Sequence, residues 1–214
     1  MTLIKTEQMR LELEAALNKV VASVGKIQIG SNEQFPFGWR KAAKGRTVWR
    51  ILEEAITQNL EHKHKEYGFE KIEAADSEVG VYDFSGRLST SKENFYVNIK
   101  SAVIGVRTNK DDISKAESLV SFFTANSNEN LFIATFMISF EADMTVSIIN
   151  AKVIPTAWLP DIYVNPSNNG NLQSSKYKDI DQAVRRTNYQ FLELLHEEII
   201  VAKRKKILKS TKDN

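Results

Sequence analysis

The chain has 214 residues, 42% of them hydrophobic and 26% charged, which suffices for a full hydrophobic core and argues against intrinsic disorder. It contains no cysteine, which excludes disulfides, thiolate metal sites and cysteine nucleophiles and fits a cytoplasmic location. The formal net charge of +2 excludes a polycation, and no apolar run approaches the roughly 20 residues that span a bilayer, so we expect no membrane association.

The N-terminal third is predicted to be helical. Apolar side chains recur at the spacing of one helix face in residues 6–24 and again in residues 45–67. Between these segments, glycines and a proline interrupt the pattern. Four polar or basic residues here are candidate DNA contacts: Gln34, Arg40, Lys41 and Lys44. The alternative, in which Phe35, Phe37 and Trp39 hold this connection in the core, stays open.

A β-rich pattern begins at residue 69. Strands are predicted at residues 79–84, 95–106, 131–140 and 144–154, with a polar turn at 85–94. Helices are predicted at residues 111–124 and 179–209, with a long polar loop at 163–179. This order predicts an α/β fold with a mixed central β-sheet flanked by helices. We expect a single domain over residues 1–214, divided into a helical part (about 1–67), a sheet core (about 69–160) and a loop with the C-terminal helix (about 161–214).

Three residues on adjacent predicted strands combine metal-binding and cationic side chains. Asp83 stands at the end of one strand, and Asn98-Ile99-Lys100 lies in the middle of the next. Side chains alternate along a strand, so Asn98 and Lys100 share a face, and a hairpin would bring Asp83 to them. A lysine in an apolar strand is costly unless it is paired or functional. Carboxylate and amide oxygens bind Mg²⁺, and an ammonium group can stabilise charge on a phosphate, so the trio predicts phosphodiester hydrolysis.

The arrangement resembles the PD-(D/E)XK nuclease motif, in particular that of type II restriction endonucleases. Tyr82 stands in place of the frequent proline, and Asn98 in place of the second acid. The resemblance implies a restriction endonuclease-like fold in which Asp83, Asn98 and the Ile99 carbonyl bind Mg²⁺ and Lys100 acts in catalysis. It further implies a homodimeric enzyme of a restriction–modification system that cleaves double-stranded DNA at a short palindromic sequence.

Members of this family often take one more acid from the preceding helix. Glu53 and Glu54 are the candidates here. Glu53 borders the apolar helix face, so we prefer it as a catalytic residue, although both can equally be solvated surface acids.

Residues that could read base edges gather in two further places. The polar loop supplies Asn168, Asn169, Asn171, Gln173 and Lys176, and the segment after the lysine-bearing strand supplies Arg107, Asn109 and Lys110. The loop can equally be a disordered polar excursion. Residues 203–212 carry six basic groups and no acid, which suits phosphates but also suits a frayed, solvated tail.

Two other functions stay open. The first is a repair or recombination nuclease of the same superfamily that reads DNA structure instead of sequence. The second is a non-catalytic DNA-binding protein that keeps the fold without the second acid, which Asn98 replaces.

Overall fold

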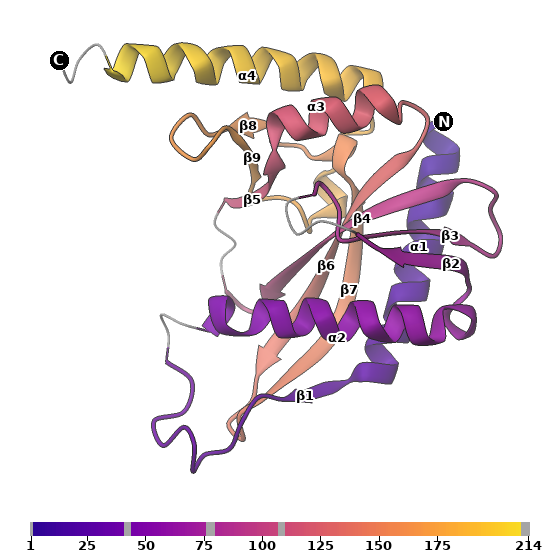
Figure 1. Cartoon of the computed structure of the whole chain (residues 1–214), viewed down its shortest axis with the longest axis vertical. Coiled ribbons are helices and arrows are strands. Elements are labelled where there is room, and N and C mark those ends of the chain that lie inside the picture. Colours follow the sequence, from indigo (N-terminus) through magenta and orange to yellow (C-terminus); the bar gives the residue numbers. More distant parts are fainter. Residues whose placement is uncertain (1, 41–43, 76–79, 107–109, 211–214) are drawn as a thin grey trace.

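The computed structural model describes residues 2–40, 44–75, 80–106 and 110–210, except for the side chains of 44–47 and 210. Its α-helices are α1 (Leu3–Val24), α2 (Lys44–Tyr67), α3 (Ala116–Ala125) and α4 (Asn188–Ser210), with 3-10 turns at Thr156–Trp158 and Ile180–Gln182 (Figure 1). Its strands are β1 (Lys26–Gln28), β2 (Phe69–Ala74), β3 (Phe84–Leu88), β4 (Asn94–Val103), β5 (Asp111–Lys115), β6 (Asn130–Phe140), β7 (Thr145–Pro155), β8 (Tyr163–Val164) and β9 (Asn171–Ser174).

A six-stranded mixed sheet with the order β1-β7-β6-β4-β3-β2 forms the centre of the described fold (Figure 1). β4 and β6 run parallel, whereas β3–β4 and β6–β7 are antiparallel pairs. β6 and β7 are largely buried on both faces, which explains their long apolar sequences. A second sheet, with the order β5-β9-β8, lies beside the first.

Helices cover both faces of the central sheet. α1 and α2 pack on one face, where Leu17 and Leu52 meet Phe95 and Phe136 in one apolar cluster. α3 and α4 build the cluster on the other face, around Trp158 and the aromatic residues Phe123 and Phe191. The predicted fold class, a mixed central sheet flanked by helices, is confirmed. Among the residues described, no helix is both long and apolar enough to cross a membrane.

Two predicted boundaries around the central hairpin are wrong. The turn expected at residues 85–94 contains β3, because Phe84, Gly86 and Leu88 point inward while polar residues between them point outward. The helix expected at residues 111–124 begins only at Ala116, since the residues before it form β5 and pair with β9. Val79, expected to start a strand, lies outside the described residues.

The C-terminal prediction also needs correction. The polar loop expected at residues 163–179 contains β8 and β9 and is therefore ordered into a sheet. The last helix begins at Asn188, nine residues later than expected from the pattern. Arg186 explains the delay, because its guanidinium donates to the carbonyls of Ala157 and Leu159 and its own carbonyl accepts from the Trp158 indole. These bonds hold the chain before α4 in a non-helical path.

Gly86 generates a prediction about the hairpin that carries the motif. A Cβ atom there would lie 2.5 Å from the backbone oxygen of Lys71 and 2.9 Å from Cζ of Phe95. We expect Gly86→Ala to lower the free energy of unfolding by about 2–3 kcal/mol, measured by urea denaturation. Lys92→Ala, in the exposed turn, is the control and should change it by less than about 0.5 kcal/mol. Equal stabilities would contradict the close packing of β2, β3 and β4.

Candidate active site

The strands β3 and β4 separate where the motif begins. Their last pair joins Phe84 to Val97, and the N–H of Asp83 donates to the carbonyl of Val97 at 2.7 Å. Beyond Val97, this edge of β4 has no β3 partner among the described residues, while β6 continues to pair its other edge. The Asp83 carboxylate fills the gap, because its Oδ2 accepts the backbone N–H of Ile99. A strand N–H that needs a partner thus fixes the position of this carboxylate.

Glu53 reaches Asp83 from α2. The buried residues Leu52 and Ile56 attach this helix to the sheet, which places Glu53 at the border of the apolar face. Its side chain is 18% exposed, lies 3.7 Å from the guanidinium of Arg50 and hydrogen-bonds to the carboxyl of Asp83. Glu54 is exposed and accepts instead from Gln58, so the preferred helix acid is the one that lies next to Asp83.

The two neighbouring carboxyl groups resist being ionised together. Burial and then the charge of Asp83 raise the pKa of Glu53 to about 7. Burial also raises the pKa of Asp83, against the opposing effects of the Ile99 N–H and the Lys100 ammonium. Two neighbouring acids whose pKa values are both raised mark a site short of positive charge, and a divalent cation would supply that charge.

Lys100 lines a cavity of about 580 Å³ together with Glu53. The same cavity is bounded by Ile99 and, from the second sheet, by Asp111 and Asp112. The Lys100 charge lowers the pKa of both Glu53 and Asp83, yet it takes part in none of the ion pairs within 4.0 Å found in the described part of the chain. Its ammonium therefore lies close enough to act electrostatically at the site without being bound to an acid.

Asn98 is held by the protein itself. It is 7% exposed, and its Nδ2 donates to the carbonyls of Val81 at 3.2 Å and Ile113 at 3.3 Å. Its Oδ1 has no hydrogen-bond partner within the described parts of the chain, so one neutral oxygen remains for a ligand. The described residues contain no group of three or more His, Asp or Glu suited to a metal ion. A cation here would therefore be held by the Asp83 and Glu53 carboxylates with neutral oxygens, a donor set that suits Mg²⁺.

Two of the polar loop residues contact Asp112, which lines this cavity, and are thereby used within the fold. Asn168 and Gln173 both donate to the carboxylate of Asp112, at 2.6 and 2.7 Å. Asn171 pairs with Lys115 in the second sheet. Of the remaining candidates, Asn169 adopts a positive φ of 50° and Lys176 lies 3.7 Å from Asp179. The alternative of a disordered excursion is wrong for these residues. Asp112 was not among the candidates predicted from sequence, because the helix predicted at residues 111–124 included it.

The other candidate DNA contacts are dispersed. Lys110 Nζ lies 3.8 Å from the ring centroid of Tyr163, and Arg40 lies 5.2 Å from that of Phe37. Gln34 accepts from the N–H of Ser31. Arg107, Asn109, Lys41 and the side chain of Lys44 fall outside the described residues.

Only part of the aromatic connection is anchored. The ring of Trp39 packs on Phe140 with centroids 4.7 Å apart, whereas Phe37 is 78% exposed. The connection is therefore attached to the core at one end and open to solvent before it.

Comparison with known proteins gives little guidance. No family model matches the sequence, and no curated protein does. Among solved structures, the chain is similar to the NlaIV restriction endonuclease with a TM-score of 0.46 and 11% identity, over 79% of this chain and 76% of that one. A likeness at this level carries no conclusion about function, which must come from the site.

Glu53 makes the stability of the metal-free protein depend on pH. A carboxyl with a pKa of 4.5 unfolded and about 7 folded contributes stability that is present below pH 4.5 and lost as the pH rises through 7. After allowance for solvent screening, we expect a loss of about 1–2 kcal/mol, measured by urea denaturation in a chelator. Glu53→Gln should abolish this loss and Glu54→Gln should keep it. Identical pH profiles for all three proteins would contradict the contact between the two carboxyl groups.

Asn98→Asp tests whether this side chain is structural. The change replaces an amide donor with a carboxylate facing the carbonyls of Val81 and Ile113. We expect the free energy of unfolding to fall by about 2–4 kcal/mol at neutral pH without metal. Asn128→Asp, at an exposed position, serves as the control and should leave stability unchanged. Unchanged stability of Asn98→Asp without metal would contradict the structural role of its amide, and recovery on adding Mg²⁺ would place the side chain at the cation as well.

Proposed function

We propose that the chain is a Mg²⁺-dependent endodeoxyribonuclease. The observation that carries this proposal is the convergence on one site of Asp83, just before β3, of Glu53 from α2 and of Lys100 from β4. Two acids with raised pKa values call for a divalent cation, and an unpaired ammonium beside them suits a phosphate. This is the charge arrangement that phosphodiester hydrolysis requires.

The protein groups have distinct roles in the proposed reaction. Asp83, fixed by the N–H of Ile99, and Glu53 would hold Mg²⁺, with the Ile99 carbonyl and Asn98 Oδ1 as neutral donors. The bound cation supplies charge that neutralises the scissile phosphate and makes water a better nucleophile. Lys100 would hydrogen-bond to the attacking water or to a phosphate oxygen, and so stabilise the added negative charge of the transition state. The proposed products carry 5′-phosphates.

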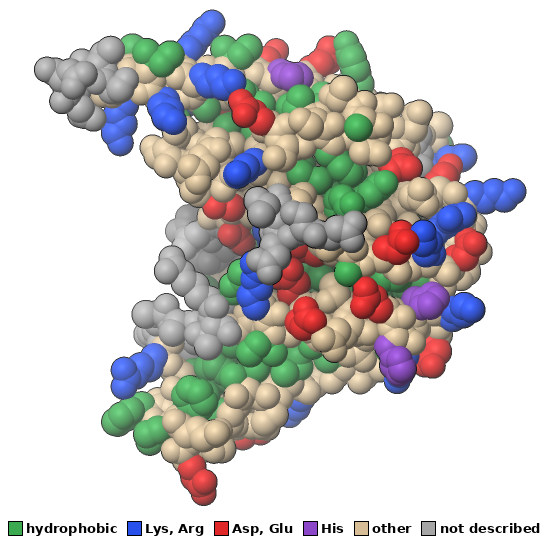
Figure 2. Space-filling view, in the orientation of Figure 1, with side chains coloured by type: hydrophobic (Ala, Val, Ile, Leu, Met, Phe, Trp, Pro, Cys, Tyr) green, Lys and Arg blue, Asp and Glu red, His purple; other side chains and the backbone are tan. Residues whose placement is uncertain are grey.

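The shape and charge of one face support DNA as the substrate. Figure 2 shows this face hollowed between α4 and the segment that precedes α2. α4 ends in the exposed basic residues Lys203, Arg204, Lys205, Lys206 and Lys209, although the net charge of the whole chain is only +2. The basic groups favour binding of the phosphate backbone of a duplex, while the recessed acidic site beside them is suited to a metal ion.

The finer proposal is a type II, sequence-specific, homodimeric enzyme of a restriction–modification system, and it rests on the resemblance of the motif. A structure-specific repair nuclease is the second candidate. The Gln173 amide favours it. Its Nε2 donates to Asp112 and its Oε1 accepts from Asn165, so both ends of the amide are already used and few hydrogen bonds remain for reading bases. A non-catalytic DNA-binding protein is the third, since Asn98 replaces the acid next to Lys100 and is itself tied into the fold.

Cleavage of plasmid DNA with Mg²⁺ tests the proposal. Wild-type protein should cut, whereas Asp83→Ala and Lys100→Ala should each reduce the rate by about 10²–10⁴-fold because they remove a cation ligand and a charge-stabilising group. DNA affinity of Lys100→Ala should stay within about threefold of wild type, measured by a gel shift. Glu53→Ala should also lose activity, while Glu54→Ala on the same helix is the matched control and should keep it.

The products separate the three candidates. Discrete bands from the wild type alone support a sequence-specific enzyme. Cutting confined to branched DNA supports the repair nuclease. Intact DNA in every lane with a retained gel shift supports the non-catalytic protein and contradicts the nuclease proposal.

A further inference from the structure

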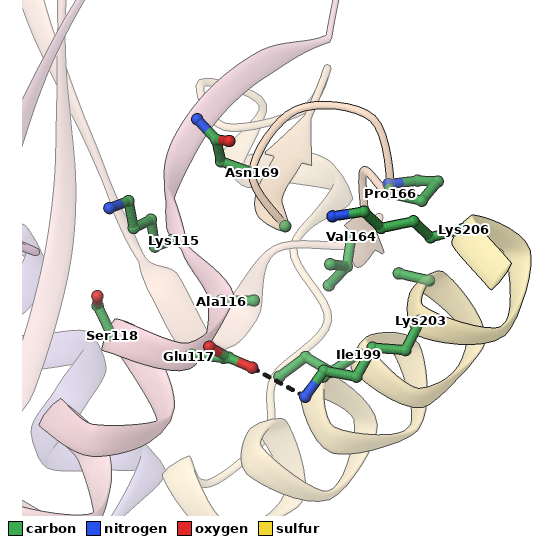
Figure 3. A pocket seen from close by; sticks show the side chains of 12 residues that line it. Lys115, Ala116, Glu117, Ser118, Val164, Pro166, Asn169, Ile199, Lys203 and Lys206 are labelled. Carbon is green, nitrogen blue, oxygen red and sulfur yellow. Dashed lines mark ion pairs between the residues drawn. The ribbon is translucent and has the colours of Figure 1, made fainter. Parts of the chain in front are cut away.

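A second cavity of about 580 Å³ lies between α3, α4 and the turn that joins β8 to β9 (Figure 3). Three lysines from two elements line it: Lys115 of β5, and Lys203 and Lys206 of α4. Its single lining acid, Glu117, forms an ion pair of 2.9 Å with Lys203. Lys115 and Lys206 take part in no ion pair found among the described residues, so the cavity has an excess of positive charge that can receive an anion.

β5 connects this cavity to the candidate active site. Asp111 and Asp112, at the start of the strand, line the catalytic cavity, and Lys115, at its end, lines the second one. Four strand steps correspond to about 13 Å. Because this length along the strand is comparable to the ~12 Å width of the major groove of B-DNA, we take both cavities to lie within reach of one duplex.

Two further lysines, Lys110 and Lys205, gather at the ring of Tyr163 beside the second cavity. Lys110 precedes β5, and its Nζ lies 3.8 Å from the ring centroid of Tyr163; Lys205 of α4 lies 5.9 Å from the same centroid. Tyr163 directly precedes Val164, which lines the second cavity. Its ring therefore holds two cations between the catalytic cavity and α4.

We propose that the cavity formed by Lys115, Lys203 and Lys206 is a phosphate subsite that binds the backbone of the DNA held at the catalytic cavity. This inference rests on the proposed function, because it takes DNA as the substrate. The Ala116, Val164 and Ala202 side chains provide an apolar wall for the sugar, and the lysines bind the phosphate oxygens as point charges. Glu117 limits the affinity by pairing with Lys203.

Duplex binding in a chelator tests the subsite. The slow Asp83→Ala protein, in chelator so that no Mg²⁺ supports cleavage, is titrated into a labelled duplex of about 20 bp, roughly two helical turns, at several salt concentrations. Adding Lys115→Glu with Lys206→Glu should raise Kd about tenfold and reduce the slope of log K against log[salt] by about 1. Glu117→Gln, which frees Lys203, should tighten binding by about 2–3-fold.

A matched control distinguishes loss of the subsite from a general effect of lower net charge on DNA affinity. Lys19→Glu with Lys65→Glu, at exposed positions of α1 and α2, makes the same change of charge and should alter Kd by less than about twofold. Equal weakening by both double variants would overturn the subsite but leave the nuclease proposal intact. Failure of the parent protein to bind any duplex would overturn DNA as the substrate and, with it, the subsite.

A free phosphate compound is the alternative ligand for this cavity, because it presents the same phosphate group as the DNA backbone. Deoxycytidine monophosphate and inorganic phosphate are added separately, and the thermal unfolding midpoint is measured. We expect neither to shift the midpoint in the wild type. A shift that Lys115→Glu with Lys206→Glu abolishes, together with unchanged duplex binding in that variant, would assign the cavity to a free phosphate compound and overturn the DNA assignment.

Discussion

The candidate site depends on one edge of β4 that loses its partner strand. β3 leaves β4 after the pair Phe84–Val97, while β6 keeps β4 extended on its other side. The N–H of Ile99 then faces the gap, and the Asp83 carboxylate accepts it. The same divergence opens the cavity into which Glu53 and Lys100 project, so the backbone geometry that needs an acid for its own hydrogen bonding also creates the space for a substrate.

The position of the second acid follows from packing on both faces of β4. Asn98 lies on the buried side of the strand, where two carbonyls take its amide protons, and a charge there would be costly. α2, packed against the opposite face through Leu52, brings Glu53 to Asp83 instead. The negative charge missing from the strand is thus present on the helix, where burial and then the charge of Asp83 raise the pKa of Glu53 to about 7.

Much of this could be predicted from sequence, and the limits have physical causes. The long apolar strands and the amphipathic helices have unambiguous periods, and the mixed sheet follows from their order. β3 was mistaken for a turn because of Gly86, since a buried glycine is indistinguishable from a turn residue until its neighbours across the sheet are known. β5 and β9 were missed because their polar side chains bond to each other, as Asp112 does with Gln173, and such pairing over a long sequence separation leaves no local pattern. The choice of Glu53 over Glu54 needed only helix geometry.

The central claim, that Asp83 and Glu53 form a cation site, is tested most directly by calorimetric titration of Mg²⁺ into the metal-free protein at about pH 6 and about pH 8. Because the pKa of Glu53 is raised to about 7, binding should be tighter at the higher pH, where no proton must be displaced. Asp83→Asn should abolish it and Glu54→Gln should leave it unchanged. Equal Mg²⁺ binding by the wild type and Asp83→Asn at both pH values would contradict the claim.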